Sequence, residues 1–145
     1  MRPLASGYSL VVRKPTIAEY VAIACSVGRK AAINHSTIKT ALANSAYCIV
    51  AEQHQQAVGM GRIVSDGAMF FYIQDIAVCV NHQGNGIGTT IVKQLLTHIH
   101  TTAPSNAFVG LFAANKAKRF YEQFGFIANL GLNGMYQVQN SVANC

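Results

Sequence analysis

A glycine-rich turn is the feature of this 145-residue sequence that is best suited to chemistry. The segment Gln83–Gly88 reads Gln-Gly-Asn-Gly-Ile-Gly; it follows an apolar strand pattern and leads directly into an amphipathic helix pattern. Glycines let backbone N–H groups converge without obstruction by Cβ atoms, and the start of a helix adds a partial positive charge. The turn therefore predicts a cradle for an anion, best suited to a diphosphate.

Two well-known phosphate-binding patterns do not fit this turn. No Gly-Lys-Ser or Gly-Lys-Thr follows the glycines, so the turn is not a P-loop. A dinucleotide-binding fold would need a β-α-β unit and an acidic residue after the next strand, yet Asp and Glu are absent between Asp75 and Glu122. A nicotinamide-dependent dehydrogenase is therefore not expected.

Composition narrows the class of protein further. Apolar residues make up 51% of the chain and charged residues 11%, which is typical of a packed globular chain and fits a single domain over residues 1–145. Eleven Lys and Arg residues against five Asp and Glu residues give a formal net charge of +6, which favours an anionic ligand. The basic residues are dispersed, so a polyphosphate small molecule fits better than a nucleic acid, and no nucleic-acid partner is expected.

The sequence predicts neither a metal site nor a membrane partner. The cysteines (Cys25, Cys48, Cys79 and Cys145) lack the spacing of metal ligands, and three of them lie in apolar surroundings that predict core positions. No apolar run approaches the roughly 18 residues that span a bilayer. The first residues do not resemble a secretion signal, so we expect a cytoplasmic protein.

The elements that must position the turn alternate between strand and helix patterns. Strands are expected at residues 8–14, 47–52, 57–64, 69–80 and 107–112. A terminal strand pair is expected in the rest of the chain after residue 124, where Gly131 and Asn133-Gly134 are turn signals. Helices are expected from the capping box Thr16–Glu19 to Gly28, and at residues 36–43, 89–100 and 115–124. The order of these elements predicts an α/β (α+β) fold in which residues 69–80 form a long central strand.

Two separate motifs resemble the GNAT superfamily of acetyl-CoA-dependent N-acetyltransferases. The family signature Gln/Arg-x-x-Gly-x-Gly/Ala is similar to Gln83–Gly88, and its tyrosine-bearing helix before a Gly-Phe pair is similar to Phe120–Phe126. The strand Tyr72–Val78 also resembles that of glucosamine-phosphate N-acetyltransferases. The resemblance covers about residues 57–126. For the chain as a whole it implies a GNAT-like mixed, mostly antiparallel sheet of six to seven strands, with helices on both faces and a splayed central strand pair.

The resemblance also implies which residues hold acetyl-CoA, the expected acyl donor. The end of the central strand would pair with the pantetheine arm, the glycine-rich turn would hold the diphosphate, and the start of the last helix would lie near both. The residues at these positions are Ile76, Ala77, Val78, Val80, Gln83, Gly84, Asn85, Gly86, Ile87, Gly88, Thr89, Asn115, Lys118 and Tyr121. Asn115 departs from the family pattern because it lies one residue closer to the tyrosine than in many relatives.

In this reading, two side chains are candidates for proton transfer. Tyr121 is the candidate general acid, because a phenol beside the sulfur can protonate a leaving thiolate; the alternative is that its ring only packs against its helix neighbours. Asp75 is the candidate base, because a carboxylate beside the cleft could take the amine proton; it could equally shape the strand. His82 is a weaker candidate base, and an amine that arrives neutral would need no base.

The acceptor is expected to be a small-molecule amine. Its binding residues are predicted among Arg29, Phe70, Tyr72 and Gln74, and the basic residues near Arg29 suggest an acceptor with a carboxylate or phosphate, although solvated surface charge explains them equally simply. The alternatives are a protein or peptide N-acetyltransferase and a non-catalytic acyl-CoA-binding module. A homodimer through an exposed edge strand is a further prediction.

Overall fold

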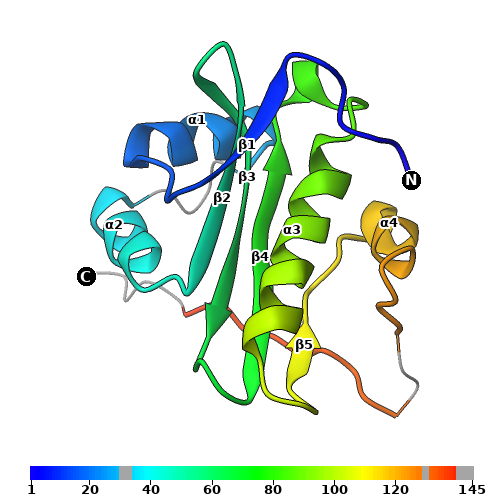
Figure 1. Cartoon of the computed structure of the whole chain (residues 1–145). Coiled ribbons are helices and arrows are strands. Elements are labelled where there is room, and N and C mark those ends of the chain that lie inside the picture. Colours follow the sequence, from blue (N-terminus) through cyan, green and yellow to red (C-terminus); the bar gives the residue numbers. More distant parts are fainter. Residues whose placement is uncertain (30–33, 129–130, 140–145) are drawn as a thin grey trace. The chain divides into compact units, whose positions relative to one another are not determined.

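In a computed structural model, the chain is described over residues 1–29, 34–128 and 131–139 and divides into two compact units, residues 1–111 and 112–145. The prediction of a single domain stays a prediction. The described residues of the first unit form five strands, three α-helices and a short 3-10 helix, whose arrangement is drawn in Figure 1. In chain order these are β1 (Tyr8–Val12), α1 (Ile17–Ser26), α2 (His35–Ala43), β2 (Tyr47–Gln53), β3 (Gln56–Ser65), β4 (Phe70–Val78), η1 (Val80–His82), α3 (Ile87–Thr102) and β5 (Phe108–Gly110).

The strands form one mixed sheet in the order β1-β2-β3-β4-β5. The first four strands pair antiparallel, and β5 pairs with β4 in parallel. The sheet is mixed and mostly antiparallel, as predicted, but it has five strands in the described residues instead of six to seven. Of the predicted terminal strand pair, residues 131–139 form no strand and are exposed, and residues 129–130 and 140–145 lie outside the described residues.

Helices cover both faces of the sheet, and two adjacent residues of β3 show how. Met60 packs with Ile23 of α1 on one face. On the other face, a Cβ atom at Gly61 would meet the side chains of Ile91 and Leu95 in α3. Because neighbouring residues of a strand point to opposite faces, α1 and α3 lie on opposite sides. The absence of a side chain at Gly61 lets α3 lie close against the sheet.

Local sequence signals explain the helices of the first unit. Thr16 caps α1, and the predicted capping box with Glu19 is complete: the Thr16 hydroxyl accepts from the Glu19 N–H, and the Glu19 carboxylate accepts from the Thr16 N–H. Asn34 caps α2. The apolar stripe predicted for the third helix is buried throughout, at Ile87, Ile91, Val92, Leu95 and Ile99. This stripe holds α3 against the sheet and thereby fixes the glycine-rich turn at its start.

The second unit is built around a short helix. A 3-10 turn, η2 (Asn115–Ala117), leads into α4 (Lys118–Glu122). The predicted helix over residues 115–124 is therefore shorter and starts as a 3-10 turn. The ring of Phe120 packs edge-on against the rings of Tyr121 and Phe124, at centroid distances of 5.0 and 5.3 Å. The apolar face predicted for this helix is therefore present.

Candidate active site

β4 and β5 separate from each other at the position that the resemblance implied. β4 runs from Phe70 to Val78, but β5 pairs with it only from Phe70 to Tyr72. In the described part of the chain, the β5 side of β4 therefore has no strand partner from residue 73 to the end of the strand at Val78. The backbone N–H and C=O groups on that edge can pair with an extended ligand in the way a further strand would. Ile76, Ala77 and Val78 lie on this stretch, and Val80 follows it in η1.

The glycine-rich turn lies directly beyond this edge and begins α3. Gly84 and Gly86 both have positive φ angles, of 80° and 76°. Gly86 occupies the N-cap position of α3 without any side-chain cap, and the first helical hydrogen bond is donated by Thr90 to the Gly86 carbonyl. The backbone N–H groups from Gly84 to Thr89 donate no hydrogen bond to any acceptor in the described residues. Six adjacent main-chain donors thus lie without an acceptor at the start of α3, which is the kind of arrangement that binds anions; the diphosphate predicted for them stays a prediction.

Side chains of the turn brace it against the start of the chain. Asn85 donates through Nδ2 to the His82 carbonyl at 3.0 Å and to the Tyr8 hydroxyl at 3.4 Å. The Tyr8 hydroxyl lies 3.1 Å from Nδ1 of His82. Gln83 donates through Nε2 to the Val78 carbonyl at 3.0 Å and so ties the turn to the end of β4. These side chains hold the backbone of the turn in place, and His82 is engaged by Tyr8.

A β-bulge in β4 sets the direction of Asp75. Arg62 of β3 pairs with Gln74, and Met60 pairs with Ala77, so Asp75 and Ile76 together oppose Gly61. Asp75 has a φ angle of 56°, which is uncommon for a residue with a side chain. The bulge turns its carboxylate toward the face of the sheet that α1 covers, where it meets Arg62. The sequence contains no glycine or other signal that predicts this bulge.

Two arginines bind the Asp75 carboxylate. Arg62 donates through Nε to Oδ2 at 2.6 Å, and the two side chains are only 17% and 16% exposed. Arg29 reaches Oδ1 at 3.4 Å and the Ile76 carbonyl at 3.3 Å, and its side chain is 50% exposed. Arg62 is therefore committed to Asp75, whereas Arg29 makes two long contacts and remains accessible. Asp75 and Arg29 were both predicted as site residues, but their contact and the ion pair of Asp75 with Arg62 were not predicted from the sequence.

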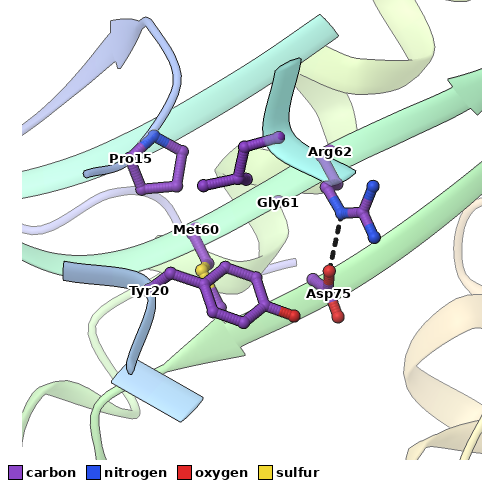
Figure 2. A pocket seen from close by; sticks show the side chains of 7 residues that line it. Pro15, Tyr20, Met60, Gly61, Arg62 and Asp75 are labelled. Atoms are coloured by element: carbon purple, nitrogen blue, oxygen red, sulfur yellow. Dashed lines mark hydrogen bonds and ion pairs between the residues drawn. The ribbon is translucent and has the colours of Figure 1, made fainter. Parts of the chain in front are cut away.

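Tyr20 of α1 completes this cluster. Figure 2 shows its hydroxyl directed toward Asp75, beside the Arg62–Asp75 ion pair. Burial, followed by the negative charge of Asp75 and a hydrogen bond to it, raises the pKa of Tyr20. The surrounding pocket is lined by Pro15, Tyr20, Leu42, Met60, Gly61, Arg62 and Asp75, and it has no room for a water molecule. The cluster is therefore a packed network in this structure rather than an open acceptor pocket.

The remaining predicted acceptor residues share the face of β4 that carries this network. Phe70, Tyr72 and Gln74 alternate along the strand, and Gln74 is the partner of Arg62. The rings of Phe70 and Tyr72 each lie 5.9 Å from the ring of Phe108 in β5. Phe70 and Phe108 are 43% and 40% exposed. An accessible aromatic surface therefore precedes the charged cluster along β4.

The predicted residues of the second unit lie on or before α4. Asn115 begins η2 and is exposed, and Lys118 begins α4 and forms an i,i+4 ion pair with Glu122 at 3.9 Å. The ring of Tyr121 is half-buried and makes edge contacts with Phe120 and with Phe126, at 5.0 and 6.2 Å. These ring contacts are compatible with either role, so both the packing role and the catalytic role of Tyr121 stay predictions.

No metal ligands and no membrane span are found within the described residues. No group of three or more His, Cys, Asp or Glu side chains is close enough to hold a metal ion among residues 1–29, 34–128 and 131–139. Over the same ranges, no helix combines the length and the apolar character required to cross a bilayer. Cys48 is buried, Cys25 and Cys79 are half-buried, and all three thiols are free. Cys145 lies outside the described residues.

Comparison with known proteins identifies the family. The family model described as "Acetyltransferase (GNAT) domain" matches residues 18–134. The chain belongs to the GNAT acetyltransferase family. Its fold is similar to that of a probable acetyltransferase from methicillin-resistant Staphylococcus aureus, with a TM-score of 0.85 and 26% identity over 91% of this chain and 99% of that one.

Curated relatives are similar over part of their length. GCN5-related N-acetyltransferase 2, chloroplastic, from Arabidopsis thaliana is 33% identical over 59% of this chain and 33% of its own. The uncharacterized N-acetyltransferase ycf52 of Pyropia yezoensis is 32% identical over 68% of this chain and 59% of its own. The chain thus spans about one third and three fifths of these two relatives.

Proposed function

We propose that the protein transfers an acetyl group from acetyl-CoA to a primary amine of a small molecule. The observation that supports the proposal most directly is the run of six main-chain N–H groups without an acceptor, from Gly84 to Thr89, next to the parted edge of β4. A diphosphate fits these donors, and an amide-containing arm fits the strand edge. The chain also contains no Asp or Glu between Asp75 and Glu122, so no carboxylate from that stretch opposes a bound anion.

In the proposed reaction, the amine attacks the thioester directly. The amine nitrogen forms a bond to the carbonyl carbon, the carbon–sulfur bond breaks, and the thiolate takes a proton. We propose that the Tyr121 hydroxyl supplies this proton, since a phenol is a weak acid suited to a thiolate of similar pKa. A backbone N–H near Ile76 or Val78 would stabilise the developing negative charge on the carbonyl oxygen.

The contacts of Asp75 favour a positioning role over that of a base. Both carboxylate oxygens of Asp75 accept hydrogen bonds from arginines, Oδ2 from Arg62 and Oδ1 from Arg29, so neither oxygen is free to receive the proton of an amine. We propose that Asp75 fixes the bulge of β4 and orients Arg62 and Arg29. The amine proton then passes to water, and the Tyr121 phenolate takes a proton back from solvent. If Asp75 is instead the base, Asp75→Asn will abolish the acidic limb of the pH–rate profile, which a positioning role would leave in place.

Arg29 favours an acceptor that carries an acidic group. Its two contacts, at 3.3 and 3.4 Å, are long, and half of its side chain is exposed. It can therefore pair with a carboxylate or phosphate of the acceptor while the Arg62–Asp75 pair remains intact. Arg29→Ala should raise KM for acidic amines and leave KM for neutral amines unchanged. Equal effects on both kinds of acceptor would refute the assignment.

One experiment tests the function as a whole. The purified chain is incubated with acetyl-CoA and a panel of amines, amino acids, amino sugars, polyamines and peptides, and free thiol is followed. Calorimetry with CoA is run alongside. Transfer to a small amine supports the proposal, and transfer only to peptides would identify a protein acetyltransferase. Binding of CoA without any transfer would identify a non-catalytic module, and no binding by the folded protein would refute the proposal.

Tyr121→Phe tests the proton donor. If the hydroxyl protonates the thiolate, turnover should fall by roughly 10²–10⁴-fold, with little change in CoA affinity. Tyr47→Phe is the matched control, since it removes the hydroxyl of a tyrosine that stacks on His98 and that belongs to neither the cofactor-binding nor the acceptor-binding residues. Unaltered turnover in Tyr121→Phe would assign the ring to packing alone.

The cytoplasmic location and the homodimer also stay predictions. Fractionation of the source cells would check the location, and analytical ultracentrifugation would check the oligomeric state.

A further inference from the structure

The segment that precedes β1 lies against the glycine-rich turn. Ala5 donates its backbone N–H to the Asn85 carbonyl at 3.0 Å, and the Arg2 guanidinium donates to the Gly84 carbonyl. A Cβ atom at Gly86 would overlap the carbonyl group of Pro3. Figure 1 shows this first stretch of the chain passing the start of α3. Residues 2–5 are therefore docked on the turn and bring one cationic side chain to it.

Arg2 is a cation without an acidic partner in the described residues. Its only hydrogen bond there is the one to the Gly84 carbonyl. The chain has five acidic residues, and each is engaged elsewhere: Glu19 and Glu52 bind Arg13, Asp75 binds Arg62 and Arg29, Glu122 binds Lys118, and Asp66 accepts from backbone N–H groups. A guanidinium has five N–H donors, so most of those of Arg2 remain available.

The turn itself contains no cation. Residues 81–92 include neither Lys nor Arg, and the next basic residue along the chain is Lys93, in the second turn of α3. The main-chain donors from Gly84 to Thr89 offer only partial charges. A full positive charge beside them would add an ion pair to the dipolar contacts that a diphosphate makes there. Arg2, which contacts the Gly84 carbonyl, brings such a charge to the turn.

We infer that Arg2 is a phosphate-binding residue, which adds a cationic contact to the diphosphate grip of the glycine-rich turn. The inference rests on the proposed function, because it assigns Arg2 to the ligand proposed for that turn. The alternative is that residues 2–5 obstruct the turn and must leave before a ligand binds. In the first case removal of the guanidinium weakens binding, and in the second it strengthens binding, so a single substitution separates the two.

The test compares Arg2→Ala and Arg2→Lys with the unchanged protein by calorimetry. The probes are CoA, dephospho-CoA and inorganic pyrophosphate. Lys39→Ala is the control, because it removes one positive charge from α2. We expect Arg2→Ala to weaken the binding of all three probes by about tenfold, as for the loss of a charge-assisted hydrogen bond at a partly exposed site. Arg2→Lys should recover part of the affinity, and Lys39→Ala should change little.

Each of the remaining outcomes would refute the inference, the proposed function, or both. Unchanged or tighter binding of CoA by Arg2→Ala would overturn the inference and leave the proposed function standing. A loss confined to CoA, with dephospho-CoA unaffected, would move Arg2 to the ribose phosphate and overturn its assignment to the diphosphate. Binding of pyrophosphate that depends on Arg2, without binding of CoA, would refute the proposed function and retain the anion contact. No binding of any probe by the unchanged, folded protein would refute both.

Discussion

Removing the charge of Asp75 should destabilise the protein through Arg62. The two side chains are joined at 2.6 Å and are 16% and 17% exposed, so Arg62 would be left largely buried without its partner. Breaking a fully buried ion pair costs about 3–5 kcal/mol, whereas an exposed pair contributes about 0–1 kcal/mol. For this partly buried pair we expect Asp75→Asn to cost about 2–3 kcal/mol, between these limits.

The backbone at Asp75 allows a second comparison. Its φ angle of 56° is tolerated by Asn better than by Ala, because a short polar side chain can bond locally in this conformation. Asp75→Ala should therefore cost about 1 kcal/mol more than Asp75→Asn, from backbone strain alone. The two variants together separate the contribution of the ion pair to stability from that of the backbone conformation at the bulge.

Urea unfolding at neutral pH measures both costs, provided that the slope with denaturant is unchanged. Glu122→Gln serves as the control, since its ion pair with Lys118 is 48% and 61% exposed and should contribute less than about 0.5 kcal/mol. An Arg62→Ala, Asp75→Ala double-mutant cycle then gives the coupling between the two side chains. A cost below about 0.5 kcal/mol for Asp75→Asn would show that the ion pair is not a structural support. Equal costs for Asn and Ala would refute the role assigned to the bulge.

Three further predictions concern the packing of α3 on the sheet, the docking of residues 2–5 and the ion pair between Glu19 and Arg13. Gly61→Ala should destabilise the first unit by about 1–3 kcal/mol in urea, since the added methyl overlaps side chains of β4 and α3; a neutral effect would contradict the close approach of α3. Gly86→Ala should displace Pro3 and speed hydrogen exchange in residues 2–5, and unchanged exchange would show that the segment is not docked there. A hydrogen bond with Arg13 lowers the pKa of Glu19, so its stabilising contribution is present above the unfolded pKa and lost as pH falls through the folded value. Glu19→Gln should therefore reduce the dependence of stability on pH in the acidic range. Urea midpoints at successive pH values measure this dependence, and an unchanged dependence would refute the role assigned to Glu19.

Local patterns were sufficient to predict most elements of the first unit. The capping box at Thr16 and the apolar stripe from Ile87 to Ile99 correspond to α1 and α3 within a residue or two of their ends. The glycine-rich turn was placed correctly because its signal is the composition of adjacent residues. The terminal strand pair was predicted from the turn signals at Gly131 and Asn133-Gly134, and such signals cannot show whether a strand finds a partner. Residues 131–139 form no strand, and residues 129–130 and 140–145 lie outside the described residues.

The features that the sequence did not predict depend on residues distant in the chain. Strict alternation would have placed Asp75 on the face opposite Gln74, but the bulge brings both to the face covered by α1. The pairing of Arg62 with Asp75 follows from that bulge. Arg2 and Gly84 are separated by 82 positions, and no local pattern relates them. Contacts between residues so distant in the chain can be identified only once the fold is known.

The parted end of β4 has a consequence for how the protein behaves on storage. Beyond the short pairing with β5, one side of this strand offers main-chain hydrogen-bonding groups that no strand of the described chain takes up. A second molecule in extended form could satisfy the same groups, which is how exposed strand edges promote self-association. A tightly held donor would then act as a temporary extra strand, and concentrated samples should stay monodisperse longer with CoA than without it.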